Sequence, residues 1–284
     1  MKSNIPKTAA LFIIALPVLT AARYLQYSTV VNPENGFFEL NGGFLNIAYY
    51  VFLVASVIMA AVFAFWDMKT KRGLRKGKIT RISVKSSVVG GMIMAAAGFL
   101  FAYEAAALFL GGGGALVFSA FLLAAAGFTL TGFALFSYGR LFPLTGFAFL
   151  LLTLFYTFRA ADEFMARINV TSISARLIIL LVNLTSALFF LSCGKIFMRA
   201  QTKFTPIFTA VCGYTASLLI FSDGAARLAH LAITDRETAG FLISAENGFN
   251  KPEPSFFFQG AAVLWLIFTL SVKTRRRKTD EDSE

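Results

Sequence analysis

Eight apolar stretches, each long enough to cross a lipid bilayer, alternate with short polar segments along this chain. A transmembrane helix needs about 20 mostly apolar residues to cross a hydrocarbon core of about 30 Å. The apolar residues come in long blocks rather than in the periodic stripes that are typical of a soluble amphipathic helix. We therefore predict transmembrane helices at Thr8–Ser28, Phe44–Trp66, Ser87–Leu110, Ala115–Tyr138, Phe142–Phe164, Ala175–Met198, Pro206–Leu231 and Ser255–Val272.

The composition agrees with this pattern. Hydrophobic residues make up 57% of the chain, charged residues make up 14%, and the mean hydropathy is +0.70, whereas a soluble domain carries about a quarter charged residues. The predicted fold is an all-α polytopic membrane bundle of eight transmembrane helices in four antiparallel hairpins. Residues 1–272 form a single transmembrane domain, and residues 273–284 form a short tail that is first basic and then acidic.

Most of the 26 Lys and Arg residues lie in alternate gaps between the predicted helices, with the highest density in the loop 67–86. Basic loops stay on the cytoplasmic side during membrane insertion, so we predict that both termini are cytoplasmic. This asymmetry explains the net charge of +11 without a nucleic-acid partner. We expect an integral protein of a bacterial cytoplasmic membrane, in contact with the lipid bilayer.

Ionisable residues occur near the outer end of every odd-numbered predicted helix. One such residue in each of these helices lies about 16 residues from the cytoplasmic start, which is about 24 Å into the membrane. Charges at this depth are costly, so they should face the interior of the bundle and pair with one another. The residues are Arg23 in the first helix, Glu104 in the third, Arg159, Asp162 and Glu163 in the fifth, and Asp223, Arg227 and His230 in the seventh.

The helical spacing of these charges predicts specific pairs. Asp223 and Arg227 are four residues apart, and Arg159 precedes Asp162 by three residues and Glu163 by four, so the members of each pair lie on the same helix face. Glu104 has no basic residue in its own helix, and we expect its partner to be Arg23 or Arg159 on another helix.

Two interpretations of these charges remain open. In the first, they form an outward-facing pocket for the transport or binding of a small anionic or zwitterionic solute. The three arginines would hold the anionic part, and Glu104 and Asp223 would couple a cation or a proton. The candidate ligand-binding or ion-binding residues are Arg23, Glu104, Arg159, Asp162, Asp223, Arg227 and His230, and the pocket would be lined by Tyr24, Tyr27, Tyr49, Tyr50, Tyr103 and Tyr156.

In the second interpretation, the charges are a structural clasp in a non-catalytic scaffold or sensor subunit, and the basic loop 67–86 is a surface for protein partners. The inner halves of the predicted helices are almost wholly apolar, which argues against a continuous hydrophilic path across the membrane.

The sequence favours a function other than catalysis. The chain has 1 histidine and 2 cysteines, which is too few for the usual zinc sites, and it carries no nucleophile-elbow or dinucleotide-binding motif. We therefore assign no catalytic residue, no metal and no cofactor. A third alternative is a membrane enzyme that uses carboxylates such as Glu104 and Asp223 on lipid headgroups of the outer leaflet.

Small residues are concentrated in the third and fourth predicted helices, where they favour close helix contact. In the third helix they include Gly91, Ala95 and Gly98, and in the fourth they include Ala125 and Gly132.

Overall fold

The computed structural model describes residues 7–29, 43–69, 84–111, 114–138, 143–165, 174–198, 200, 202, 204–233 and 254–271, and within these ranges it is helical with no strand. Its helices are α1 (Lys7–Thr29), α2 (Gly43–Lys69), α3 (Val84–Leu110), α4 (Ala115–Tyr138), α5 (Pro143–Met165), α6 (Ser174–Phe197), α7 (Thr205–Ile233) and α9 (Pro254–Ser271).

These helices coincide with the eight predicted segments, and their ends differ from the predicted ends by a few residues only. The described parts of 6 of them, α1, α2, α3, α4, α6 and α7, are long and apolar enough to cross a membrane. Helix α5, which carries Arg159, Asp162 and Glu163 near its end, is not among these 6. The described part of helix α9, Ser255–Thr269, is apolar but shorter than these.

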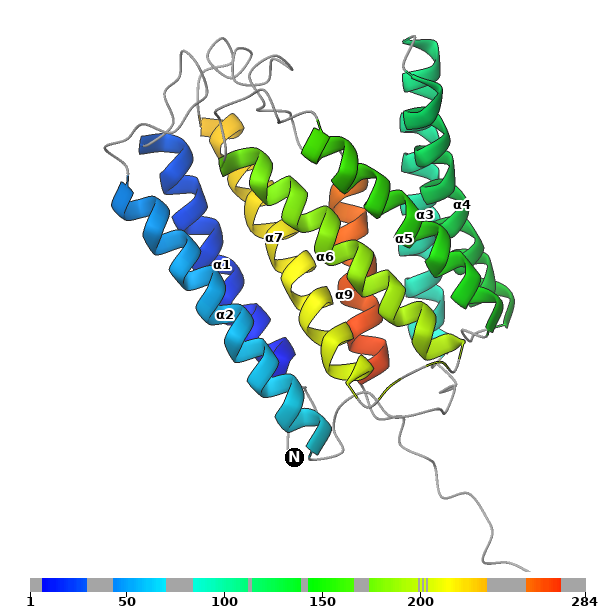
Figure 1. The fold of residues 1–284 in the computed structure, drawn as a ribbon, viewed down its shortest axis with the longest axis horizontal. Helices are drawn as coiled ribbons and strands as arrows, with labels where there is room; N and C mark the ends of the chain where they lie inside the picture. Colours follow the sequence, from blue (N-terminus) through cyan, green and yellow to red (C-terminus); the bar gives the residue numbers. More distant parts are fainter. Residues whose placement is uncertain are drawn as a thin grey trace, which may run out of the picture.

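The helices pack as neighbouring hairpins, because α1 contacts α2, α3 contacts α4, α5 contacts α6, and α7 contacts α9. Helix α7 also packs against α1, α2 and α6, while α9 also packs against α3. Figure 1 shows α1 and α2 at one side of the molecule and α3 and α4 at the other, with α6, α7 and α9 between them.

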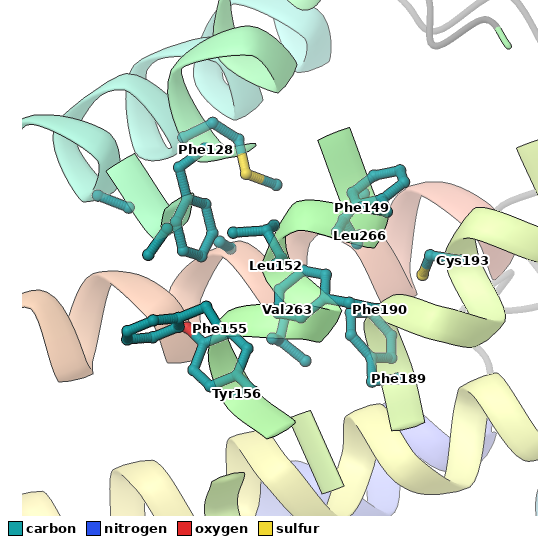
Figure 2. Close-up of a cluster of buried hydrophobic side chains, with 14 of the residues drawn as sticks. Phe128, Phe149, Leu152, Phe155, Tyr156, Phe189, Phe190, Cys193, Val263 and Leu266 are labelled. Atoms are coloured by element: carbon teal, nitrogen blue, oxygen red, sulfur yellow. The ribbon is translucent and has the colours of Figure 1, made fainter. Parts of the chain in front are cut away.

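The largest buried apolar cluster lies on the side of α3 to α6 and is rich in aromatic rings (Figure 2). The ring of Phe190 on α6 stacks on the ring of Tyr156 on α5, with a centroid distance of 5.5 Å, and meets the ring of Phe128 on α4 edge to face at 5.8 Å. Offset or edge-to-face ring pairs add to the stabilisation that burial gives. A second cluster joins α1 and α2 to α6, α7 and α9.

The small residues of α3 and α4 form the close helix contact that the sequence predicts. A Cβ atom added to Gly98 would lie 3.1 Å from the backbone oxygen of Ala125, and one added to Gly132 would lie 3.2 Å from the backbone oxygen of Gly91. The two backbones therefore approach each other closely only because glycine has no side chain at these positions.

The topology prediction rests on segments that the structure does not describe. Residues 70–83 of the basic loop 67–86, the tail 273–284 and the first six residues of the chain lie outside the described residues.

Candidate functional site

Three helices bring a group of charged and polar side chains together. Arg23 lies in the last two turns of α1, and Asp223 and Arg227 lie four residues apart in the second half of α7, so these two project from the same helix face. Helices α1 and α7 pack against each other, and both pack against α2. The first turns of α2 add Asn46 and Tyr49.

Asp223 is the centre of this group. Its Oδ1 atom accepts hydrogen bonds from the Nε of Arg23 at 2.9 Å and from the hydroxyl of Tyr27 at 2.5 Å. Its Oδ2 atom forms an ion pair with the Nε of Arg227 at 2.8 Å. Asp223 is 1% exposed, so its carboxylate is enclosed by partners, and bonds of this charge-assisted kind are about twice as strong as neutral ones.

Arg23 links the carboxylate to α2 through a chain of amide groups. Its Nη1 donates a hydrogen bond to the Oε1 of Gln26 at 2.8 Å. The Nε2 of Gln26 in turn donates to the Oδ1 of Asn46 at 3.1 Å and to the backbone oxygen of Leu45 at 3.3 Å. Arg23 and Gln26 are both 0% exposed, so this chain lies inside the protein. We call Arg23, Gln26, Tyr27, Asn46, Asp223 and Arg227 the Asp223 cluster.

Aromatic rings cover the guanidinium groups of the cluster. The guanidinium carbon of Arg23 lies 4.5 Å from the ring centroid of Tyr27 and 5.4 Å from that of Tyr49, and the guanidinium carbon of Arg227 lies 6.0 Å from the ring of Tyr27. Cation–π attraction operates at these distances. The ring of His230, which is half-buried, lies 6.3 Å from the ring of Tyr27 and extends the aromatic cover toward the end of α7.

A second, separate group lies on the other side of the molecule. The side chain of Tyr156 on α5 interacts electrostatically with Glu104 on α3 and with Arg159 on α5, and the guanidinium carbon of Arg159 lies 5.2 Å from the ring centroid of Phe121 on α4. Glu104 and Arg159 are both half-buried. We call Glu104, Tyr156 and Arg159 the Glu104 group.

The predicted charged residues therefore lie in two places, not around one pocket. Arg23 binds Asp223 on α7 and does not face Glu104, because α6, α7 and α9 lie between α1 and α3 (Figure 1). The predicted pair of Asp223 with Arg227 is confirmed.

Near the end of α5, the predicted pair of Arg159 with Asp162 does not form. Asp162 is exposed, and among the described residues no ion pair joins it to Arg159, whose guanidinium lies over Phe121 instead. Glu163 is half-buried.

The sequence interpretation missed Gln26. A polar residue three positions after a buried arginine lies on the same helix face, and that spacing is the signal that identifies it. The sequence predicted Tyr27 and Tyr49 only as lining residues of a pocket. The structure adds the hydrogen bond of Tyr27 to Asp223, the contact of the Tyr49 ring with Arg23 and the hydrogen bond of Gln26 to Asn46.

The Asp223 cluster has the chemistry of an ion-pair network. It contains no cysteine or serine nucleophile, and its single carboxylate is surrounded by cationic and hydroxyl partners. Within the described part of the chain, no group of three or more His, Cys, Asp and Glu side chains is placed to hold a metal ion. The arrangement is suited to holding helices together or to binding an anion through guanidinium groups.

No protein-family model matches this chain, and neither a curated protein nor a solved structure is similar enough to indicate a relationship.

Proposed function

We propose that all eight helices cross a membrane and that both termini lie in the cytoplasm. Helices α5 and α9 contain 23 and 18 residues, and at 1.5 Å per residue they are about 34 Å and 27 Å long. These lengths are close to the thickness of the hydrocarbon core, about 30 Å. The positive-inside distribution of Lys and Arg supports the orientation, which places the Asp223 cluster and the Glu104 group near the outer leaflet.

The protein acts as a non-catalytic membrane scaffold or sensor subunit, and the Asp223 cluster is its structural clasp. The observation that carries this proposal is the enclosure of Asp223, which is 1% exposed and is bound by Arg23 and Tyr27 of α1 and by Arg227 of α7. A carboxylate that binds a solute has to be accessible to that solute. The charges of a structural clasp, by contrast, are paired with one another and shielded from water. A carboxylate with three partners on two helices fits the clasp.

The hydroxyl groups of the buried helices support the same proposal. A hydrophilic transport path needs polar groups that face the path, yet the hydroxyls of Thr131, Ser192 and Thr209 each donate to the backbone oxygen four residues earlier in their own helix. Such bonds satisfy the hydroxyl locally. The inner parts of these helices therefore offer few polar groups to a passing solute.

Binding of a small anionic or zwitterionic solute is the second candidate function. It is favoured by the convergence of the Arg23 and Arg227 side chains on one carboxylate, because guanidinium groups are the protein groups best suited to binding carboxylates and phosphates. This function requires that a solute displace part of the existing network.

Thermal unfolding of the detergent-purified protein distinguishes the two functions. Wild type is compared with Asp223→Asn, and Asp162→Asn is the matched control because Asp162 is exposed. Each protein is melted with amino acids, organic anions, inorganic phosphate and monovalent salts. A clasp predicts that no compound raises the melting temperature of wild type and that only Asp223→Asn melts earlier. A compound that stabilises wild type and the control, but not Asp223→Asn, would instead establish solute binding.

A further inference from the structure

The Glu104 group occupies corresponding positions on two helices that run in the same direction. Alternate helices of the bundle are parallel (Figure 1), and the rings of Phe101 on α3 and Phe155 on α5 meet edge to face with a centroid distance of 5.2 Å. Glu104 follows Phe101 by three residues, and Arg159 follows Phe155 by four. A carboxylate and a guanidinium therefore lie one helical turn beyond the same ring contact, one on each helix.

The Glu104 group also contains a buried polar atom, the hydroxyl oxygen of Tyr156, that has no hydrogen-bond partner among the described residues. The hydroxyl of Tyr156 is buried, Tyr156 is 1% exposed, and the hydroxyl has no hydrogen-bond partner among the described residues. It nevertheless interacts electrostatically with both Glu104 and Arg159. Buried hydroxyl groups normally have a partner, so the Tyr156 hydroxyl indicates a position where an external group donates or accepts.

Aromatic rings pack against the Glu104 group. Phe121 on α4 lies under the guanidinium of Arg159, and its ring contacts the ring of Phe155 with a centroid distance of 5.4 Å. Figure 2 shows Phe155 and Tyr156 side by side in the buried cluster. The rings that pack against Arg159 and Tyr156 are therefore apolar and in contact with one another.

The two charged residues of the site are partly exposed at the surface of the bundle. Glu104 and Arg159 are half-buried, and near Glu104 on α3 the side chains of Tyr103 and Phe109 are 67% and 66% exposed. Large apolar residues with this exposure face lipid in a membrane-spanning helix. A ligand that comes from the bilayer can therefore reach the two charged groups sideways, without opening the bundle.

Glu104 lies at about the depth in the membrane at which lipid headgroups begin. Helix α3 contains 27 residues and is about 40 Å long, and Glu104 lies six residues, or about 9 Å, before its end. A helix of this length extends about 5 Å beyond each side of a hydrocarbon core of about 30 Å. Glu104 therefore lies within about 4 Å of the boundary between acyl chains and headgroups.

We propose that Glu104, Tyr156 and Arg159 bind the headgroup of a phospholipid that carries a primary ammonium and a phosphodiester, as phosphatidylethanolamine does. Arg159 binds the phosphodiester, because a guanidinium is suited to phosphate oxygens. Glu104 accepts hydrogen bonds from the ammonium group, and the Tyr156 hydroxyl donates to a phosphodiester oxygen. The assignment to the outer leaflet rests on the topology proposed above. The binding itself uses different residues from the Asp223 cluster, so it can fail without affecting the proposed clasp.

The test is a titration of the detergent-purified full-length protein with short-chain phospholipids, read out by native mass spectrometry. Phosphatidylethanolamine is compared with phosphatidylcholine, whose quaternary ammonium has no hydrogen-bond donor, and with phosphatidylglycerol, which has no ammonium. The variant Tyr156→Phe removes only the hydroxyl, which makes no hydrogen bond among the described residues, so the fold should be retained. The matched control is Tyr103→Phe, which removes an exposed hydroxyl next to Glu104.

We expect wild type and Tyr103→Phe to bind phosphatidylethanolamine more tightly than the other two lipids. Tyr156→Phe should weaken that binding about threefold to tenfold, the size expected for the loss of one hydrogen bond. Glu104→Gln should abolish the preference for phosphatidylethanolamine over phosphatidylglycerol.

Three results would overturn the proposal. The first is equal affinity of wild type for all three lipids, and the second is unchanged phosphatidylethanolamine binding by Tyr156→Phe. The third is binding of free glycine or phosphoethanolamine that depends on Tyr156 as strongly as lipid binding does, because it would identify a soluble zwitterion as the ligand. Thermal unfolding of each variant shows whether the protein used in the titration is folded.

Discussion

A carboxylate inside a helical membrane protein needs cationic or hydrogen-bonding partners, because an unpaired ion costs several kcal/mol to remove from water. At the scale of single residues, Asp223 meets this requirement with Arg23, Arg227 and Tyr27. Each partner is itself enclosed, since Tyr27 is 3% and Arg227 is 7% exposed. The loss of any one of them therefore leaves polar groups buried with fewer partners.

Tyr27 provides the mildest test of this network. The variant Tyr27→Phe removes the donor of the 2.5 Å hydrogen bond to Asp223 and keeps the ring that covers Arg23. We expect the free energy of unfolding to fall by about 1–2 kcal/mol, the range for a hydrogen bond to a charged group in a membrane protein. The measurement is unfolding of the purified protein in mixed micelles.

The matched control for this prediction is Tyr24→Phe. Tyr24 is also on α1 and also lies beside His230, with a ring centroid distance of 6.4 Å, but it is only half-buried. Its loss should change the free energy of unfolding by less than about 0.5 kcal/mol. Equal effects of the two variants would mean that the hydroxyl of Tyr27 has no special role.

At the scale of the helices, close contact between α3 and α4 depends on glycine. A Cβ atom at Gly98 would lie 2.7 Å from the Oγ1 of Thr129 and 3.0 Å from its backbone nitrogen. Because the backbone cannot rotate away as a flexible side chain can, the two helices would have to move apart. In a membrane, where apolar contacts with lipid replace those between helices, close packing is a main source of helix association.

Gly98→Ala should therefore lower the free energy of unfolding by about 1–3 kcal/mol, as overpacking does in a well-packed core. The matched control is Gly43→Ala in the first turn of α2, where an added Cβ atom meets nothing within 4 Å. The control should be neutral or slightly stabilising, because alanine favours a helix over glycine. If Gly98→Ala unfolds like the control, the close contact does not contribute to stability.

The positions of the helices were predictable from the sequence, but their arrangement in the bundle was not. Long apolar blocks predict each helix and its ends, because membrane thickness fixes the length that is needed. The spacing of Gly91, Gly98 and Gly132 predicts the contact between α3 and α4. The apolar pattern does not indicate which helices are neighbours, because lipid-facing and helix-facing residues are both apolar. The insertion of α6, α7 and α9 between α1 and α3 therefore could not be predicted.

The candidate site was predictable only in part for the same reason. The pair of Asp223 with Arg227 follows from a spacing of four residues within one helix. The bond between Arg23 and Asp223 joins residues 200 positions apart, and a partner for Arg23 on α3 or α5 was equally compatible with the charges. Division of the charged residues into two groups follows from the helix arrangement and not from any local pattern.

At the scale of the whole molecule, the proposed orientation makes a prediction about opposite faces of the membrane. A cysteine placed at Ser283 should react with a membrane-impermeant maleimide only after cells are opened, because the basic segments should lie in the cytoplasm. A cysteine placed at Asn35 should react in intact cells. The natural Cys193 and Cys212 are buried and should give little background. Labelling of both positions from the same side would contradict an odd number of spans between them, which eight spans with both termini in the cytoplasm require.

The most direct test of the central claim is a double-mutant cycle on the bond between α1 and α7. The free energy of unfolding in mixed micelles is measured for wild type, Arg23→Gln, Asp223→Asn and the double variant. If the two residues hold the helices together, each single variant leaves a buried charge or dipole with too few partners, and the double variant loses less than the two singles combined by at least about 1 kcal/mol. Additive losses, within about 0.5 kcal/mol, would contradict the clasp.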